Sequence, residues 1–260
     1  MAQAIWTGTV GFGLVQVPVR IVSATKSKDV SFNQLDAESG SRVRIKRVSE
    51  ATGEEVPSDR IVKGYEISKG RYVVVDSTEL EAIEPKSSHT IEIEEFVDLA
   101  SIDPLYFEQS YYLAPDPKGA KPYRLLVDAM QELEKVALGK VVIRTKERLV
   151  AIRPLDGVLV ISTMRFADEV VGRDTLLPET DADPSDRELK MARQLVESLT
   201  VDDFEPDKYH DTYREQLLGL IERKAAGEEI VAPAAAQQEA PVLDLVAALE
   251  QSLARAQKSA

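Results

Sequence analysis

Short apolar runs separated by turn residues dominate the first 175 residues of the chain. β-branched and aromatic residues recur in these runs, which is typical of strands in a β-barrel or a β-sandwich. The glycines on either side of Phe12 predict a first tight turn at residues 11–13. The expected strands are residues 5–10, 14–19, 30–35, 42–48, 72–75, 90–97, 106–113, 136–144, 149–153 and 158–166.

One helix is expected among these strands. Pro122 suits the first turn of a helix, where the backbone donor that proline lacks has no partner in any case. Apolar residues then recur every three or four positions, which predicts one buried helix face. These residues are Tyr123, Leu126, Val127, Met130 and Leu133.

The pattern becomes mainly helical after residue 175. Residues 176–186 are rich in proline and acidic residues, which favours a linker. Ser185 and Glu188 match a capping box, in which each side chain satisfies a backbone donor of the first helical turn. The helix that they open carries Leu189, Ala192, Leu195, Val196 and Leu199 on its apolar positions.

A second helix is expected after Pro206 and is predicted to end near Gly227, a residue type favoured just beyond helix ends. Its apolar residues are Tyr213, Leu217, Leu220 and Ile221. We therefore expect an α+β protein that is mainly β. Its predicted parts are a core over residues 1–175, a helical arm over 176–230, and a tail over 231–260.

The tail is expected to hold a flexible linker and a short amphipathic helix. The apolar stripe of this helix is Val242, Leu245, Val246, Leu249 and Leu253. An isolated helix of this length is marginally stable, so the stripe must be covered. It docks either on the protein's own core or in a groove of another protein, and the tether favours the second.

Composition narrows the functional classes. The chain contains no cysteine, which excludes disulfides, thiolate zinc sites and cysteine nucleophiles. No apolar stretch is long enough to cross a membrane, and no P-loop signature occurs. We expect no cofactor, no bound metal and no catalytic residue.

The net charge of −13 over 260 residues lowers the expectation of nucleic-acid binding, but the charge is uneven. Residues 1–50 hold seven Lys or Arg against four Asp or Glu. Affinity for phosphates depends on cations at the contact surface rather than on the total. A basic surface on an acidic protein is therefore possible.

Three basic segments stand out. On a strand, Arg42, Arg44 and Lys46 would share one face about 6.6 Å apart, close to the spacing of two steps along a DNA strand. The same row could simply protect an exposed strand edge from aggregation, and both interpretations stay open. A second row is Arg144, Lys146 and Arg148. A third group is Arg20, Lys26 and Lys28.

A metal-dependent phosphoesterase is a weaker alternative. Its candidate ligands are Glu92, Glu94 and Asp98. Glu92 and Glu94 alternate with Ile91 and Ile93, which more simply describes the solvated face of a half-buried strand. A further alternative is a protein-interaction scaffold that does not bind DNA directly.

Several ordered blocks of the sequence closely resemble the prokaryotic Ku proteins of non-homologous end joining. They lie at residues 4–19, 40–47, 61–66, 111–115, 140–154, 165–169 and 209–215. The resemblance extends over residues 1–224, and residues 242–253 are similar to the minimal C-terminal segment of the family.

The resemblance implies a β-barrel core, an arm that closes a ring with a second copy of the chain, and a helical arm that helps dimerise. It implies sequence-independent binding of double-stranded DNA ends by a non-enzymatic homodimer in the cytoplasm, associated with the nucleoid. The block at residues 40–47 would line the ring through Arg42, Arg44, Lys46 and Arg47. Lys63, in the next block, and the Arg144–Arg148 row would add to it.

The resemblance also implies that the C-terminal helix recruits the ATP-dependent ligase D. One departure concerns the end of the chain. Many members of the family carry a long lysine-rich tail, whereas here only Arg255 and Lys258 lie near the end. DNA binding would therefore rest on the lining of the ring.

Overall fold

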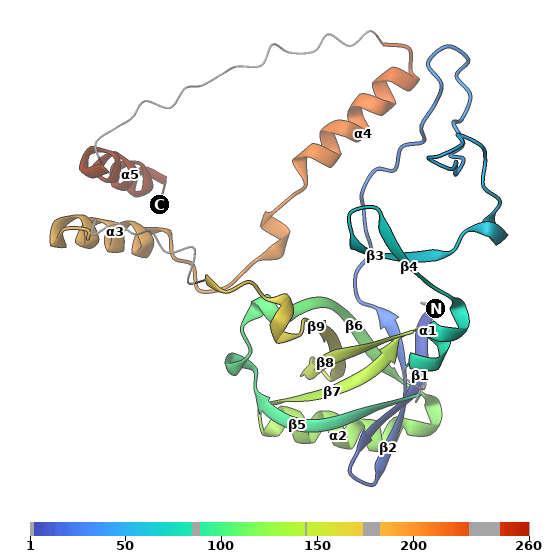
Figure 1. Ribbon diagram of the computed structural model, residues 1–260. Helices are drawn as coiled ribbons and strands as arrows, with labels where there is room; N and C mark the ends of the chain where they lie inside the picture. The colour runs from blue at the N-terminus through green and yellow to red at the C-terminus, as the bar shows by residue number, and fades with distance from the viewer. Residues whose placement is uncertain (1–2, 85–88, 144, 174–182, 229–244, 260) are drawn as a thin grey trace. The chain divides into compact units, whose positions relative to one another are not determined.

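The computed structural model describes residues 3–84, 89–143, 145–173, 183–228 and 245–259 (Figure 1). The described chain divides into two compact units. The first comprises residues 1–28 and 33–172, and the second comprises residues 29–32 and 173–260. No helix among the described residues is long and apolar enough to cross a membrane.

Seven strands of the first unit close into a barrel (Figure 1). Their order around the barrel is β1-β2-β6-β9-β8-β7-β5, and all neighbours are antiparallel except β1 and β5. The strands are β1 Ala4–Phe12, β2 Val15–Ser23, β5 Thr90–Asp98, β6 Phe107–Pro115, β7 Lys135–Ile143, β8 Lys146–Leu155 and β9 Val158–Met164. The predicted α+β, mainly β class is confirmed.

The interior of the barrel is filled by aliphatic side chains. Alternate residues of each strand point inward, so Val17, Val19 and Ile21 on β2 are completely buried. Helix α2 (Ala120–Glu132) covers the end of the barrel at which β6 ends and β9 begins. Its face of Tyr123, Leu126, Val127 and Met130 joins the same core.

Tyr123 attaches α2 to the barrel. Its hydroxyl donates to the carbonyl of Leu113 on β6 at 2.7 Å and accepts from the amide of Leu159 on β9 at 2.8 Å. Burial raises the pKa of this phenol, and the hydrogen bond from the Leu159 amide opposes that rise. The polar tip of a large apolar side chain is therefore fully satisfied inside the core.

Two details of the predicted barrel are wrong. The first turn lies at Gly13 and Leu14 rather than at residues 11–13, because Gly13 adopts a φ of +59° that glycine tolerates best. The helix ends at Glu132, so Leu133 is not part of its buried face and is 66% exposed. Glu134 has a φ of +54° and turns the chain into β7.

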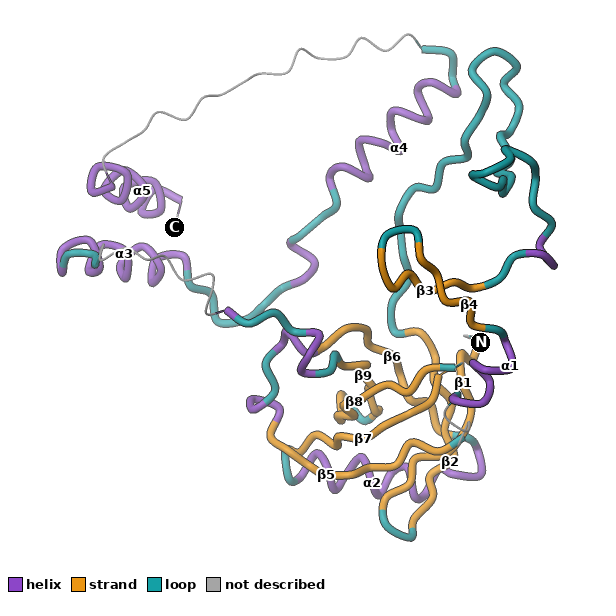
Figure 2. Tube along the Cα trace, in the orientation of Figure 1, coloured by secondary structure: helices purple, strands orange, loops and turns teal. Residues whose placement is uncertain are grey.

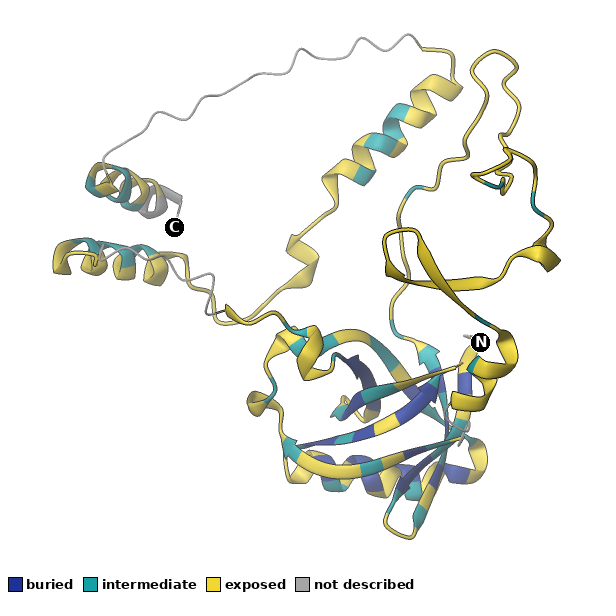
Figure 3. Cartoon of the chain, viewed as in Figure 1, coloured by how far each residue is buried: buried dark blue, intermediate teal, exposed yellow. Residues whose placement is uncertain are grey.

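Residues 24–76, here called the arm, connect β2 to the rest of the first unit's sequence. The arm contains one regular hairpin, β3 (Lys63–Ser68) paired with β4 (Arg71–Val75), and helix α1 (Ser77–Ile83) follows it (Figure 2). All of β3 is exposed, and most of β4 is too (Figure 3).

The strands predicted at residues 30–35 and 42–48 are absent. Only two isolated bridges occur there, Leu35 with Arg42 and Val48 with Glu55. The β-branched residues that suggested strands are exposed, Ile45 to 88%, so no third strand or apolar layer extends these contacts into a sheet. A two-stranded contact without such cover does not propagate.

The second unit is helical. Its helices are α3 Asp186–Leu199, α4 Thr212–Ala225 and α5 Leu245–Ser259 (Figure 1). The capping box at the start of α3 is confirmed, since Ser185 and Glu188 exchange side chain to backbone hydrogen bonds. Residues 206–208 form a separate 3-10 turn before α4.

Helix α4 is less amphipathic than its sequence suggested. Leu217 and Leu220 are half-buried, but Tyr213 is 72% exposed. Gly227 follows the helix with a φ of +82°, and its amide donates to the carbonyl of Lys224, as expected for a residue that ends a helix. The linkers predicted at residues 176–186 and 231–241 lie largely outside the described residues.

Candidate nucleic-acid interface

The most basic segment of the arm follows a tight turn at residues 36–41. The amide of Asp36 donates to the carbonyl of Ser41, and Gly40 adopts a φ of +67°. The carboxylate of Asp36 accepts from the hydroxyl of Ser39, and this hydrogen bond lowers the pKa of Asp36. The turn fixes where the basic segment begins.

Four cations lie within six residues after this turn, with no acidic residue among them. Arg42 donates to the side-chain carbonyl of Asn33 at 2.6 Å, and Lys46 pairs with Glu55 at 2.6 Å. The guanidinium groups of Arg44 and Arg47 have no polar partner within the described residues. Because the segment is not a strand, the regular spacing predicted for Arg42, Arg44 and Lys46 does not apply.

All four cations are exposed. The pair of Lys46 with Glu55 is solvated on both sides, so its strength is small and the ammonium group stays available to another anion. The segment is therefore a run of exposed positive charges that follows a hydrogen-bonded turn, and it can approach phosphates without matching any base pattern.

The third predicted group is divided. Lys26 and Lys28 are exposed at the start of the arm, and Lys63 is exposed at the first position of β3. Arg20 lies on the outer face of β2, half-buried, and its Nε is buried without a hydrogen-bond partner in the described structure. Arg20 is thus held by packing against the sheet rather than extended into solvent.

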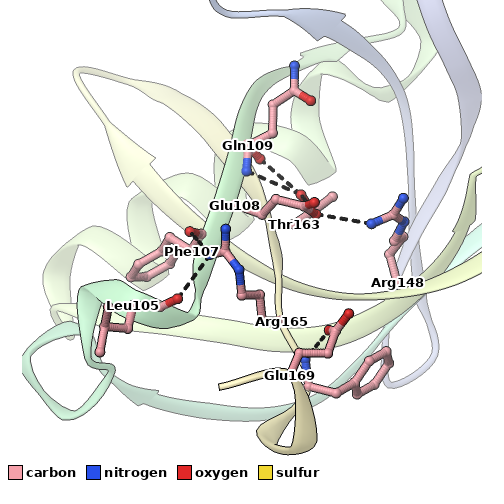
Figure 4. A network of polar contacts seen from close by, with 9 residues as sticks. Leu105, Phe107, Glu108, Gln109, Arg148, Thr163, Arg165 and Glu169 are labelled. Carbon is pink, nitrogen blue, oxygen red and sulfur yellow. Dashed lines mark hydrogen bonds and ion pairs between the residues drawn. The ribbon is translucent and has the colours of Figure 1, made fainter. Parts of the chain in front are cut away.

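Lys146 and Arg148 line one hollow at the end of the barrel opposite α2, and Figure 4 shows Arg148 beside Glu108 and Thr163. The guanidinium of Arg148 donates to Glu108 at 3.0 Å, and the hydroxyl of Thr163 donates to the same carboxylate oxygen at 3.2 Å. Lys146 makes no ion pair with a described residue. Arg144 lies outside the described residues.

Arg165 has a structural role beside this group. Its guanidinium donates to the carbonyls of Leu105 at 3.0 Å and Phe107 at 2.8 Å, where the chain enters β6 (Figure 4). Glu169 accepts from the amide of Phe166 at 2.8 Å and closes the turn after β9. The block at residues 165–169 thus stabilises the rim of the barrel next to Glu108.

The carboxylates proposed for a phosphoesterase do not converge. Glu94 pairs with Lys140 at 3.5 Å, and Asp98 pairs with Lys135. Glu92 is exposed on the outer face of β5, as the alternation with Ile91 predicted. Within the described residues no three acidic or histidine side chains gather at metal-binding distance, and nothing in this group favours hydrolysis.

The apolar stripe of the C-terminal helix lies along α3. Val246, Leu249 and Leu253 are half-buried, and Arg187 of α3 pairs with Glu250 of α5 at 3.0 Å. Leu245 is 56% exposed, and Val242 lies outside the described residues. The sequence left open whether this helix packs on its own chain or on another protein. In the structure, α5 packs on α3 of its own chain.

Sequence reasoning missed the neutral and acidic residues around Lys146 and Arg148. They are Ser23, Glu108, Gln109, Tyr111 and Thr163. The available signal was that the inward positions of several strands turn polar at one end. That signal becomes visible only with the strand order, because β2, β6 and the β8–β9 hairpin are far apart in sequence.

Comparison with known proteins agrees with this architecture. The family model of the Ku70/Ku80 beta-barrel domain matches residues 11–191, which include the last two residues of β1, the other six barrel strands and the arm. The chain belongs to the Ku family.

Bacterial members of the Ku family are similar over nearly the whole chain. A relative in Anaeromyxobacter sp. (strain K) is 50% identical over 99% of this chain and 87% of its own length. Relatives in Koribacter versatilis and Mycobacterium tuberculosis are 42% and 39% identical, over 98% and 96% of this chain and 87% and 94% of their own lengths. Each is described as a non-homologous end joining protein Ku.

Proposed function

We propose that this protein binds the ends of double-stranded DNA in non-homologous end joining, independently of base sequence and without catalysing a reaction. Membership of the Ku family supports this function, and so do the bacterial relatives, which are named as non-homologous end joining proteins. The observation that carries it is the exposed run Arg42–Arg47, four cations without an acid in a chain of net charge −13. Contacts from such a run of cations would be made to the phosphates of the DNA backbone, which carry no sequence information, rather than to the bases.

The direct test compares a linear duplex with a closed circle of the same sequence. Threading onto an end requires an end, so the linear form should bind much more tightly in a fluorescence anisotropy titration. If six to ten phosphates are contacted, affinity should fall by about 10³ to 10⁵ between 50 and 200 mM salt. Equal affinity for circle and linear duplex would contradict end binding.

A charge-reversal variant tests the arm. Changing Arg42, Arg44 and Lys46 to glutamate should abolish end binding while circular dichroism shows the same fold. A matched control changes Lys118, Lys121 and Arg124 to glutamate, since these cations lie at α2 on the opposite end of the barrel from Lys146. If the control variant loses DNA binding and the arm variant keeps it, the arm is not part of the DNA interface.

We further propose that the protein acts as a homodimer. The β3–β4 hairpin exposes Tyr65, Tyr72 and Val74 by more than half, and an isolated hairpin with an uncovered apolar surface is marginally stable. A second copy of the chain is the cover favoured by the self-complementary nature of twofold interfaces. Light scattering of a Tyr65→Ser, Tyr72→Ser variant should show a shift toward monomer; an unchanged mass would place the dimer contact elsewhere.

The stripe Val242, Leu245, Val246, Leu249 and Leu253 is proposed to recruit the ATP-dependent ligase D. Because α5 lies on α3, the ligase would have to bind the exposed part of α5 or displace α3 from it. Deleting residues 231–260 should leave end binding intact and reduce stimulation of the ligase. Full stimulation by the truncated protein would contradict this role.

A further inference from the structure

The inward-facing positions of the barrel change from apolar to polar at one end. Along β2, Val19 and Ile21 are buried and the next inward position is Ser23. Along β9, Leu159 and Ile161 are followed by Thr163. Alternation places these side chains on the same face as the core.

The other two strands of this end behave in the same way. On β8 the inward series reads Lys146 and Arg148 before the buried Val150 and Ile152. On β6 it reads Gln109 before Tyr111 and the buried Leu113. Four strands, of which only β8 and β9 are consecutive in sequence, thus place polar groups around one opening, called here the barrel mouth.

The barrel mouth is a hollow of about 600 Å³ with a mixed lining. Its apolar side chains are Ile5, Tyr111 and Ile143, which come from three different strands. Its polar side chains include the cations Lys146 and Arg148 and the hydroxyl of Thr163. Hollows of this size that combine apolar side chains with a few convergent polar groups are typical of small-ligand sites, and barrel mouths are a preferred location.

Charge in the barrel mouth is net positive. The lining contains Lys146, Arg148 and one carboxylate, Glu108. Glu108 holds Arg148 through the 3.0 Å ion pair, and Thr163 donates to that carboxylate (Figure 4). The pair orients Arg148 and leaves the ammonium of Lys146 without a partner among the described residues.

We propose that the barrel mouth binds a nucleoside 5′-monophosphate. The phosphate would lie against Lys146 and Arg148, which suit a phosphate oxygen through charge-assisted hydrogen bonds. The base would lie against the ring of Tyr111, an arrangement that tolerates any base because each has a flat apolar face. The bound unit is a free nucleotide or the 5′-terminal nucleotide of a DNA strand.

Binding of a 5′-terminal nucleotide rests on the proposed function, because only an end-binding protein would present such a nucleotide to the barrel mouth. Binding of a free nucleotide does not rest on that function. Binding of AMP by the full-length protein, measured by calorimetry without DNA, therefore tests the site independently of end joining. Adenosine serves as the probe that lacks the phosphate and should bind at least about tenfold more weakly.

Two variants give effects of opposite sign. Lys146→Ala removes the unpartnered cation and should weaken AMP binding by about tenfold or more. Glu108→Gln removes the only carboxylate of the lining and frees Arg148, so AMP should bind more tightly. Lys121→Ala, on α2 at the other end of the barrel, is the matched control and should leave AMP binding unchanged.

The proposal is overturned if AMP does not bind, if it binds Lys146→Ala as tightly as the control variant, or if Glu108→Gln weakens it. A merely structural role for Glu108 predicts such weakening, because Arg148 would lose its support. Chemical shifts of the Thr163 and Gln109 amides locate the bound nucleotide at the barrel mouth. Shifts confined to the arm would also overturn the proposal.

A second experiment, with DNA, distinguishes the free nucleotide from the 5′-terminal nucleotide of a DNA strand. Linear duplexes with a 5′-phosphate or a 5′-hydroxyl are titrated against the wild type and Lys146→Ala. A preference for the phosphorylated end that Lys146→Ala removes supports the terminal nucleotide as ligand. AMP binding without such a preference supports the free nucleotide, and failure of every linear duplex to bind contradicts the proposed function but not the site.

Discussion

The barrel and the arm are both built from β-rich sequence, but only the barrel buries it. Val10, Val17 and Ile91 in the barrel have no exposed surface. In the β3–β4 hairpin, Tyr65 and Tyr72 remain 71% and 62% exposed. Figure 3 shows the contrast, with dark strands in the barrel and an almost wholly exposed hairpin.

The two regions also differ in how their backbone N–H and C=O groups find hydrogen-bond partners. Every barrel strand has two neighbours, because the sheet is closed and has no free edge. The arm relies on local contacts, such as the 2.8 Å hydrogen bond between Asp36 and Ser41 and the bridge between Val48 and Glu55. The barrel therefore pairs its backbone groups within its own sheet, whereas the arm keeps polar and apolar groups available to a ligand or a partner.

The largest expected effect is the loss of a barrel core side chain. Leu113→Ala should lower the free energy of unfolding by about 2–5 kcal/mol, because it removes buried atoms and leaves a cavity. Val73→Ala in the hairpin should change it by less than about 0.5 kcal/mol. Urea unfolding followed by the fluorescence of Trp6, the only tryptophan and a barrel core residue, measures both; equal losses would contradict the contrast.

A smaller effect is expected at the hydroxyl that joins α2 to the barrel. Tyr123→Phe leaves the Leu113 carbonyl and the Leu159 amide without their partner, which should cost about 1–3 kcal/mol. Tyr213→Phe, at a position of α4 that is 72% exposed, is the matched control and should have no measurable effect. If Tyr123→Phe is equally silent, water replaces the hydroxyl and α2 is held by its apolar face alone.

These two regions also mark how far the sequence predicts the structure. Alternation and turn residues predicted all seven barrel strands and α2, because each pattern is set by burial on one face. The same β-branched signal failed at residues 30–35 and 42–48, where no neighbouring strand completes a sheet. Propensity describes a residue's fit to a half-buried surface, and in the arm that surface is missing.

The sequence likewise predicted only part of the candidate site. Arg44 and Arg47 were expected to contact DNA; both are exposed, and the contact itself stays a prediction. Glu108 and Thr163 were not expected beside Arg148, since they are 40 and 15 residues away in sequence and meet only through the strand order. Side chains that act together from non-adjacent strands require the register, which no local pattern contains.

A moderate effect is expected when single cations of the arm are removed. Arg44→Ala should lower the salt dependence of DNA-end binding by about 0.9 in the slope of log affinity against log salt, the value of one phosphate contact. Lys46→Ala should have a smaller effect, because Lys46 already shares its charge with Glu55. Titrations at several salt concentrations measure both slopes. The reverse order would mean that the ion pair with Glu55 breaks on binding and that Lys46 is the closer contact.

The smallest effect concerns the turn that begins the basic segment. Hydrogen bonds from Ser39 and from the Glu38 amide lower the pKa of Asp36, so the ionised carboxylate stabilises the turn. A lowered pKa means that this contribution is present above the ordinary value of about 3.9 and is lost as the pH falls through the lower value of the folded protein. An NMR titration should therefore show the amides of Glu38 and Ser39 changing at acidic pH while the barrel amides stay constant. Ser39→Ala removes the main donor and should raise the pKa of Asp36. An unchanged pKa in that variant would mean that the backbone amides alone hold the turn, and concurrent changes in the barrel would contradict the independence of the two regions.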